Sequence, residues 1–305
     1  MTAADPNRPP RASLLERASD WFDYAPPPPM TGPRHDPLPP MTPEPPVDAG
    51  AETAFAAPVV RERVSIDRDR LIEQGMLVPG APVTSLAEEF RLVKRQLLTN
   101  IRAIAADRPA LARSILVCSA RPGDGKTFCA TNLALSLAAE RDVDVLLVDA
   151  DVAKPGLPRV LGLEDGPGLL DAISDPMQNV ESLVLDTDIP NLQVLRAGTR
   201  GNDDTELLAS ERARDVIAGL ARADARRIVV FDSPPALAAS PAGVLAGLVG
   251  QVMLVVRADR TTETDVRDAV ALLDGCASVQ LLLNAVSLRP GGNRYGDYYV
   301  QGGAA

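Results

Sequence analysis

From about residue 114 onward, short apolar runs alternate with longer segments whose apolar residues recur at helical spacing. The runs are rich in Val, Leu and Ile and are bounded by turn residues, as is typical of strands buried on both faces. Alternation of such strands with helices predicts a parallel sheet covered by helices on both sides. The expected strands are SILVCSA (114–120), VDVLLVDAD (143–151), RIVVFDSPP (227–235), GQVMLVVRA (250–258) and VQLLLNA (279–285), and the expected helices span 126–140, 204–223 and 262–276.

Two further helical patterns precede this region. VSIDRDRLIEQGMLVP (64–79) predicts a short helix that ends near Gly75 and Pro79. SLAEEFRLVKRQLLTNI (85–101) carries an apolar helical stripe made of Phe90, Val93, Leu97 and Ile101. We therefore expect a short helix and a linker over 61–84, followed by a main α/β domain, a doubly wound and mostly parallel sheet, over 85–290.

Residues 1–60 hold more than half of the 28 prolines and predict a disordered segment with polyproline II character. SLLERASDWFD interrupts it and predicts a short amphipathic helix near 13–23. Two interpretations stay open for this helix. It packs on the main domain, or it docks on a partner or a membrane surface.

Composition narrows the class of protein. Hydrophobic residues make up 46% of the chain but aromatic residues only 3%, so the core is aliphatic. The net charge of −10 and the pI of about 4.7 argue against a general nucleic-acid binder. No apolar run is long enough to span a bilayer and no signal peptide is visible, so we expect a soluble, cytoplasmic protein without a membrane span.

The inventory of reactive side chains excludes some chemistries. His35 is the only histidine and lies in the proline-rich segment, which excludes a Ser-His-Asp triad and a histidine-rich metal site in the folded part. The cysteines, Cys118, Cys129 and Cys276, are scattered and lack C-x-x-C spacing, so they indicate buried thiols in a reducing compartment.

The first expected strand runs directly into RPGDGKT (121–127) and then into a helix, which is the context of a P-loop. Gly123 and Gly125 let backbone N–H groups turn toward phosphate oxygens, and the helix N-terminus adds its positive end. Lys126 supplies a charge for the β- and γ-phosphates, and the Thr127 hydroxyl is a magnesium ligand. Ala120 stands where the usual pattern begins with glycine, and the competing interpretation is a chance glycine-rich turn. The candidate nucleotide-binding residues are Arg121, Pro122, Gly123, Asp124, Gly125, Lys126, Thr127 and Phe128.

Three carboxylates follow two of the expected strands. Asp149 and Asp151 end one strand and Asp232 ends another. Because the carboxyl ends of parallel strands line the ligand crevice, these residues suit Mg²⁺ held between carboxylates and phosphates. Each alone could be a turn former or a helix cap, but three facing one lysine-bearing loop favour a site for ATP and Mg²⁺.

Together, SARPGDGKTFCATNLA, VLLVDADVAKPGL, IVVFDSPPAL and the terminal NRYGDYYVQ resemble the bacterial tyrosine autokinases of exopolysaccharide biosynthesis, of the type found in exosortase-associated loci, and the resemblance covers residue 64 to the end. It implies that Lys126 and Thr127 bind ATP·Mg²⁺ and that Asp232 is the Walker B carboxylate. It assigns Asp149 and Asp151 to the second acidic motif, one directing the metal and the other a base for the tyrosine hydroxyl. Asn284 then matches a position that contacts adenine.

The same resemblance implies partners. Glu88, Arg91 and Lys94 match a helix that links subunits into a ring, and a transmembrane polysaccharide co-polymerase-type activator recruits the kinase to the inner face of the plasma membrane. A cognate tyrosine phosphatase belongs to the same system. Two departures stand out: Ala153, followed by Lys154, replaces an arginine of the second acidic motif, and Lys94 replaces the second arginine of the linking helix.

Three of the four tyrosines, Tyr295, Tyr298 and Tyr299, lie in the glycine-rich tail 291–305. A phosphoryl acceptor must be exposed and able to reach an active site, so we interpret this tail as the autophosphorylation substrate of a neighbouring subunit. The alternative is an aromatic anchor or terminal strand on the core.

Two other functions stay open at this stage. A MinD- or ParA-like ATPase switch would hydrolyse ATP without phosphorylating protein, with Arg121 in place of its signature lysine. A nucleotide-binding scaffold without catalysis would fit the loss of arginine at Ala153.

Overall fold

The computed structural model describes residues 61–109 and 111–286. These residues form an eight-stranded sheet in the order β1-β4-β5-β3-β6-β2-β7-β8. All neighbouring strands are parallel except the pair β4 and β5. The strands are β1 (Arg63–Val64), β2 (Ser114–Ser119), β3 (Asp144–Asp149), β4 (Leu185–Thr187), β5 (Leu192–Leu195), β6 (Arg227–Asp232), β7 (Gln251–Arg257) and β8 (Val279–Asn284).

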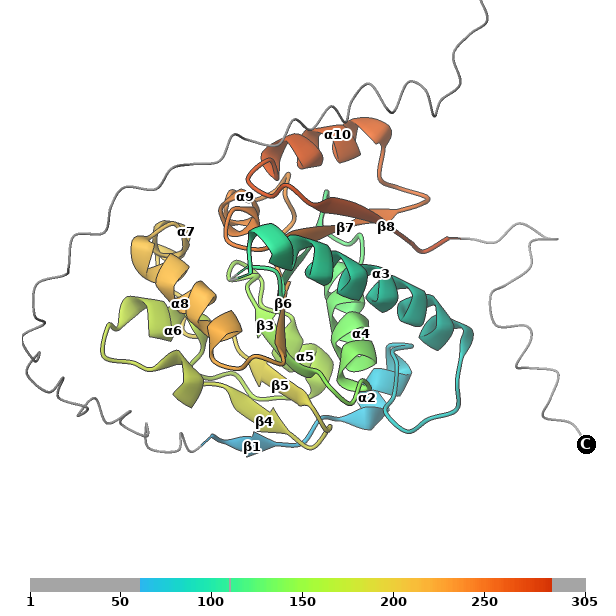
Figure 1. The fold of residues 1–305 in the computed structure, drawn as a ribbon, viewed down its shortest axis with the longest axis horizontal. Helices are drawn as coiled ribbons and strands as arrows, with labels where there is room; N and C mark the ends of the chain where they lie inside the picture. Colours follow the sequence, from blue (N-terminus) through green and yellow to red (C-terminus); the bar gives the residue numbers. More distant parts are fainter. Residues whose placement is uncertain (1–60, 110, 287–305) are drawn as a thin grey trace, which may run out of the picture. The chain divides into compact units, whose positions relative to one another are not determined.

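Helices cover both faces of the sheet (Figure 1), and each face has its own apolar core. One face packs against α2 (Arg68–Glu73), α3 (Ser85–Asp107), α4 (Lys126–Ala138) and α5 (Leu157–Leu161). The other packs against α6 (Leu169–Ser174), the 3₁₀ turn η1 (Val180–Ser182), α7 (Asp204–Leu208), α8 (Glu211–Arg222), α9 (Pro241–Ala246) and α10 (Glu263–Leu272). The prediction of a doubly wound, mostly parallel sheet is confirmed.

The strand register places the functional carboxylates next to each other. β3 and β6 are paired so that Asp149 lies directly opposite Asp232. The strand β2, which leads into the P-loop sequence, lies on the other side of β6. The carboxyl ends of these three central strands therefore meet at one edge of the sheet, as expected for a ligand crevice.

The structure adds elements that the apolar pattern did not predict. β1 and β4 have two and three residues, too few for a period-2 pattern, and they extend the sheet at one edge together with β5. Residues 61–84 thus contribute a strand to the main sheet as well as the expected helix. The segment 204–223 is divided into α7 and α8, because the Ser210 hydroxyl accepts a hydrogen bond from the Ala213 N–H and starts a second helix.

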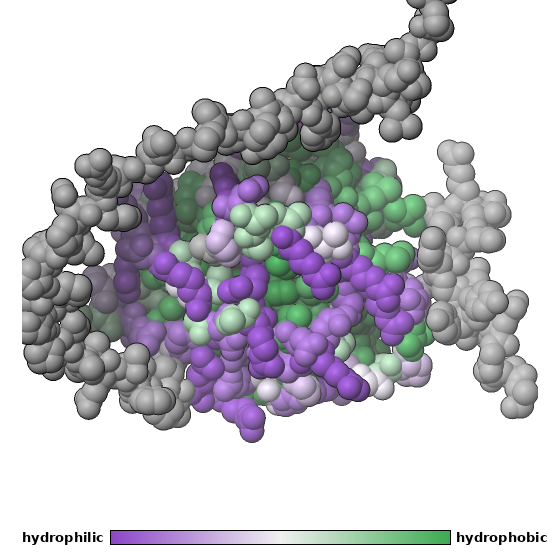
Figure 2. Space-filling model, viewed as in Figure 1, coloured by the Kyte–Doolittle hydropathy of each residue, from purple (hydrophilic) through white to green (hydrophobic). Residues whose placement is uncertain are grey.

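Polar side chains cover much of the face shown in Figure 2, and apolar residues are visible in the recess at its centre and on the side where β8 lies in Figure 1. No helix within 61–109 and 111–286 has the length and apolar character needed to cross a bilayer.

We expect Leu147→Ala to lower the free energy of unfolding by about 2–5 kcal/mol, because Leu147 is fully buried in β3 and its truncation leaves a cavity. Urea denaturation followed by circular dichroism measures the change. Leu92→Ala on α3 is the matched control, since Leu92 is 48% exposed and should cost less than about 0.5 kcal/mol. Equal effects of the two substitutions would contradict the assigned core.

Candidate functional site

The loop between β2 and α4 has the backbone of a phosphate cradle. Gly123 and Gly125 have φ angles of 85° and 99°, in the left-handed region that favours glycine. A Cβ atom on Gly125 would lie 2.2 Å from Nδ2 of Asn284, so a side chain there would displace Asn284 as well as strain the loop. α4 begins at Lys126, and its N-terminal N–H groups point into the same loop region.

Side chains from distant strands hold this loop in place. Asn284, the last residue of β8, donates from Nδ2 to the Asp124 carbonyl oxygen at 2.9 Å. Arg257, the last residue of β7, donates from Nη1 to the Gly123 carbonyl oxygen at 3.2 Å. Inside the loop, the buried Asp124 carboxylate accepts a hydrogen bond from the Arg121 N–H at 2.9 Å. The loop is therefore preorganised by the fold itself.

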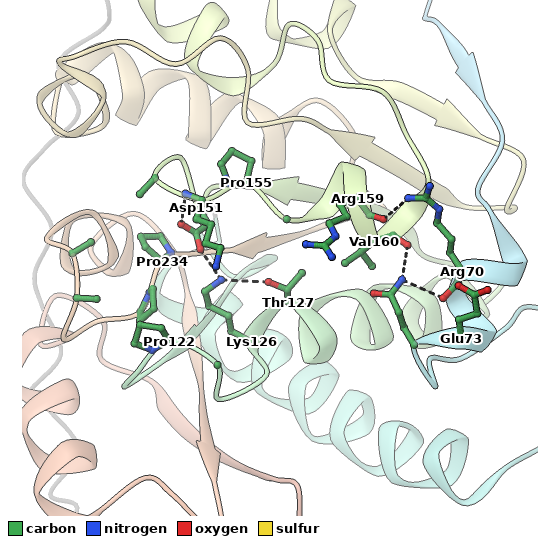
Figure 3. A pocket seen from close by; sticks show the side chains of 18 residues that line it. Arg70, Glu73, Pro122, Lys126, Thr127, Asp151, Pro155, Arg159, Val160 and Pro234 are labelled. Atoms are coloured by element: carbon green, nitrogen blue, oxygen red, sulfur yellow. Dashed lines mark hydrogen bonds and ion pairs between the residues drawn. The ribbon is translucent and has the colours of Figure 1, made fainter.

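A cleft of about 810 Å³ opens beside this loop (Figure 3). One wall is formed by Pro122, Gly123, Lys126 and Thr127 of the P-loop region. Another is formed after β3 by Asp151 and the residues from Ala153 to Gly156. Pro234 and Pro235 follow β6 and complete the side near Lys126. The cleft thus lies at the carboxyl ends of the three central strands.

Lys126 stands at the centre of the charged groups. Its Nζ lies 2.6 Å from Oδ2 of Asp151 and 3.8 Å from Oδ1 of Asp232, and it donates to the Thr127 hydroxyl at 3.3 Å. Burial by itself lowers the pKa of Lys126, but the carboxylates of Asp232 and Asp151 outweigh this effect and raise it. The lysine is therefore held in its charged form, as a phosphate-binding cation requires.

Asp232 is fully buried, and among the described residues neither carboxylate oxygen has a hydrogen-bond partner. Burial raises its pKa to about 7, with a further increase from Asp149 and a decrease from Lys126. A buried carboxylate with free oxygens is costly unless a cation compensates it, so Asp232 fits a magnesium ligand.

Asp149 has a different local role from Asp232. Its Oδ2 accepts hydrogen bonds from the N–H groups of Gly156 at 2.9 Å and Leu157 at 3.0 Å, and its Oδ1 accepts one from Asp151 at 3.2 Å. Burial nevertheless raises the pKa of Asp149 to about 6. Asp149 therefore shapes the loop that carries Asp151, and a direct metal contact by Asp149 stays a prediction.

The residues present fit a magnesium nucleotide. Within the described ranges, no group of three His, Cys, Asp or Glu side chains could hold a metal by itself. Mg²⁺ in nucleotide sites is typically bound by one or two carboxylates together with substrate phosphates, so such a group is not required. Asp232 and the Thr127 hydroxyl both lie next to Lys126 and have the oxygen atoms that such an ion prefers, and their role as its ligands stays a prediction.

Three other predicted nucleotide-binding residues, Arg121, Phe128 and Asn284, are not among the residues that line the cleft. The Arg121 guanidinium binds the Asp265 carboxylate of α10 at 2.8 Å and holds the pKa of Asp265 at about 2. Phe128 is half-buried and packs against the core on the α4 face of the sheet. An adenine contact by Asn284 stays a prediction, and its amide nitrogen is bound to the P-loop.

The three residues predicted to link subunits lie on α3. Glu88 and Arg91 form an ion pair with each other and are partly exposed. Lys94 is buried, and its Nζ lies 2.9 Å from the Ser136 carbonyl oxygen of α4 and 2.6 Å from Oε1 of Glu140, which follows α4. Lys94 thus fastens α3 to the domain, and a role of this helix between subunits stays a prediction.

Some predicted features lie outside the described residues. These are the proline-rich segment with its helix near 13–23, His35, and the tail with Tyr295, Tyr298 and Tyr299.

The far wall of the cleft was not predicted. Arg70 and Glu73 of α2, together with Arg159 of α5, line the end away from Lys126 (Figure 3). Arg70 donates from Nη1 to the Arg159 carbonyl oxygen at 3.0 Å, which connects the two helices. These residues read as ordinary helix-surface charges, and only the packing of α2 on α5 brings them to the site.

Comparisons with known proteins agree with this architecture. A family model described as "ParA: NUBPL iron-transfer P-loop NTPase" matches residues 110–274. The iron chemistry in that description has no counterpart in the site, since Cys118, Cys129 and Cys276 are buried free thiols. The fold, the loop and this match define a P-loop NTPase of the ParA group.

Proteins of similar sequence identify a narrower family within this group of P-loop NTPases. The tyrosine-protein kinase YwqD of Bacillus subtilis is 28% identical over 70% of this chain and 85% of its own length. The putative tyrosine-protein kinase EpsB of Ralstonia nicotianae is 33% identical over 62% of this chain, but the match spans only 26% of EpsB. The solved kinase domain of VpsO is 30% identical with a TM-score of 0.52, covering 64% of this chain and 98% of that domain. Within the ParA group, the chain belongs to the family of bacterial tyrosine-protein kinases.

Proposed function

We propose that the protein is an ATP-dependent protein-tyrosine kinase that phosphorylates Tyr295, Tyr298 and Tyr299 in the tail of a neighbouring copy and thereby regulates exopolysaccharide biosynthesis. One observation carries the proposal: at the preorganised loop, Lys126 lies between Asp151, which lines the cleft with a side chain that is 5% exposed, and Asp232, which is fully buried and does not line the cleft. Asp151 and Asp232 differ in their position relative to the cleft and in their hydrogen-bond partners. They therefore suit two different roles, Asp151 as the base and Asp232 as a magnesium ligand.

Phosphoryl transfer depends mainly on position and electrostatics. The N–H groups of the P-loop and of the start of α4 bind the phosphates, and Lys126 neutralises charge on the transferred group. Asp232 and Thr127 would hold Mg²⁺, which supplies charge neutralisation between the phosphates.

Asp151 suits the role of the base. Without nucleotide it is paired with Lys126 at 2.6 Å, and its Oδ1 accepts a hydrogen bond from the Lys154 N–H. The γ-phosphate of ATP competes for the same ammonium group, so binding of the nucleotide releases Asp151. Its carboxylate then faces the cleft, where it can accept the proton of an incoming tyrosine hydroxyl.

The tail supplies acceptors with the right chemistry. Three tyrosines and Asp297 lie among Gly, Asn, Gln and Ala, in a sequence without helical or strand periodicity. Each phosphorylation adds roughly −1.5 to −2 charges to a chain whose net charge is already −10. Repulsion among modified tails would then loosen a ring of subunits, whose contacts we assign to α3 with Glu88 and Arg91.

The family of the relatives also indicates which proteins act together with this kinase. Several relatives carry names of tyrosine-protein kinases, among them EpsB, AmsA and wzc. We propose that a transmembrane polysaccharide co-polymerase-type protein activates this kinase and recruits it to the inner face of the plasma membrane. A cognate tyrosine phosphatase would reset the tail.

Labelled ATP tests the kinase assignment. We expect the full-length protein, incubated with Mg²⁺ and the cytoplasmic segment of its activator, to incorporate phosphate into the tail. Changing Tyr295, Tyr298 and Tyr299 together to Phe should abolish the label. Tyr24→Phe is the matched control, because Tyr24 is the remaining tyrosine. Mass spectrometry locates the phosphotyrosine.

Two results would contradict this assignment. An unlabelled tail in the wild-type protein with its activator removes the kinase function. ATP turnover that continues at the same rate after loss of the three tyrosines, without any phosphotyrosine, favours a ParA-like ATPase switch instead.

A further inference from the structure

A second pocket lies beside the nucleotide cleft. It has a volume of about 360 Å³ and shares Ala153, Lys154 and Pro155 with the cleft. Arg196, Ala197, Gly198 and Arg200, in the segment that follows β5, also line it. The pocket therefore opens at the same edge of the sheet as the nucleotide site, separated from it by one short segment of chain.

The lining of this pocket is strongly positive. Three cationic side chains, from Lys154, Arg196 and Arg200, face a single carboxylate from Asp165. Lys154 and Arg200 are exposed at the rim, and Arg196 is only 8% exposed. Arg200 donates from Nη1 to the Ala153 carbonyl oxygen at 3.1 Å, which holds its guanidinium against the wall shared with the cleft.

The positive charge of the buried Arg196 side chain is only weakly balanced by its neighbours. Among the described residues its Nε has no hydrogen-bond partner, and its ion-pair partner Glu62 lies at 3.7 Å, with a side chain that is 62% exposed. Burying a guanidinium without full hydrogen bonding is costly, so the pocket favours an anion that completes the set. A Cβ atom on Gly166 would lie 2.3 Å from Nη1 of Arg196, so glycine keeps this side of the guanidinium free of side-chain atoms.

We propose that this pocket is a subsite for a phosphate monoester, namely a phosphotyrosine already formed in the tail of a neighbouring copy. The inference rests on the proposed kinase function and extends it. A dianionic phosphate with three acceptor oxygens matches one lysine and two arginines. The acceptor tyrosines are three or four residues apart or adjacent, and an extended chain spans about 10 Å over three residues. One tail can thus place a phosphotyrosine in this pocket while another of its tyrosines lies in the adjoining cleft.

This arrangement makes the first phosphorylation promote the next ones. The modified tyrosine anchors the tail through Lys154, Arg196 and Arg200, and the remaining tyrosines are held near Asp151 at high local concentration. Multiply phosphorylated tails then accumulate early, before all tails carry one phosphate.

Peptide binding to the full-length protein tests the subsite directly. The probes are two peptides of residues 291–301, one unmodified and one with phosphotyrosine at Tyr299, and fluorescence anisotropy measures their Kd. We expect the phosphopeptide to bind at least about tenfold more tightly, as one or two charge-assisted hydrogen bonds provide. Arg200→Gln and the conservative Arg196→Lys should each bring the ratio of the two Kd values close to one. Arg222→Gln, an exposed arginine on α8, should keep the wild-type ratio.

Competition with inorganic phosphate shows whether the pocket prefers phosphotyrosine or binds any phosphate. We expect it to displace the phosphopeptide only at concentrations far above the Kd of the peptide. If free phosphate binds as tightly as the phosphopeptide, the assignment to phosphotyrosine is overturned. It is also overturned if the two peptides bind equally in the wild type, or if the preference survives both pocket substitutions in proteins with unchanged circular dichroism spectra.

Kinetics with the same peptides separates this inference from the kinase function. We expect KM for the phosphopeptide to be about tenfold lower than for the unmodified peptide, with a ratio near one for Arg200→Gln. Transfer to the unmodified peptide without any advantage of the phosphopeptide overturns the subsite and leaves the kinase function intact. Preferential binding of the phosphopeptide without transfer to either peptide supports the subsite and contradicts the kinase function.

Discussion

Replacing Lys126 with alanine should remove both tight ATP binding and phosphoryl transfer. Lys126 is the cation that connects Asp151, Asp232 and Thr127, and it occupies the position from which a P-loop lysine contacts the phosphates. We expect kcat to fall by about 10³ or more, the scale seen when a preorganised charged group is lost from a transition state. Equilibrium dialysis with ATP and Mg²⁺ measures binding, and the labelled-ATP assay measures transfer.

The loss of ATP binding by Lys126→Ala is informative only if the variant is folded. Asp151 is buried and Lys126 is partly buried, so the substitution leaves an unpaired carboxylate and lowers the stability of the nucleotide-free protein. The control is the shift of Tm caused by ATP·Mg²⁺ relative to each protein without nucleotide. At 100 times Kd the wild type should gain about 2.7 kcal/mol, whereas Lys126→Ala should gain nothing. ATP binding by Lys126→Ala as tight as in the wild type would remove the basis of the enzyme assignment.

Asp232→Asn should inactivate the kinase and stabilise the nucleotide-free fold. The buried Asp232 carboxylate has no hydrogen-bond partner among the described residues, and burial raises its pKa from 3.8 to about 7. A pKa difference of one unit corresponds to about 1.4 kcal/mol. The ionised Asp232 carboxylate therefore lowers the free energy of unfolding of the nucleotide-free protein by about 4 kcal/mol above pH 7. The neutral amide removes part of this cost, so Tm should rise by several degrees, while phosphoryl transfer should fall about 10³-fold because the cation loses its ligand.

The pH dependence of this stabilisation follows from the same pKa. Between about pH 4 and 7 the native carboxyl of Asp232 holds a proton that the unfolded chain has released, so its contribution to stability falls as pH rises through this range. The Tm difference between Asp232→Asn and the wild type should therefore be smallest near pH 4 and largest above pH 7. Asp215→Asn, at an exposed position on α8, should show no such trend. A Tm difference that is independent of pH would contradict the raised pKa.

The sequence predicts the centre of the sheet and of the site because both depend on local signals. Continuous apolar runs followed by Asp or by a glycine-rich turn mark β2, β3 and β6, and parallel pairing brings their ends together. Lys126 therefore lies within ion-pair distance of both Asp151 and Asp232, as the motifs indicate.

The remaining parts of the site depend on tertiary contacts without local signals. Arg70 on α2 reaches the cleft only because α2 packs against α5, and its charge pattern is that of a solvated helix. Arg196 follows the four-residue strand β5, and its burial comes from the neighbouring loops. Asp149 matches a catalytic motif in sequence. In the folded structure, however, it accepts hydrogen bonds from Gly156 and Leu157 and so fixes the loop after β3, which no local sequence signal indicates.

The contact between Asn284 and the Asp124 carbonyl oxygen sets a limit for shortening the chain. Asn284 ends β8 and lies in the sequence before Tyr295, the first of the three acceptor tyrosines. A deletion intended to remove only the acceptor tyrosines must therefore begin after Asn284. A cut that includes Asn284 would take away the amide that supports the loop around Lys126, and the resulting loss of activity would be wrongly ascribed to the missing acceptors.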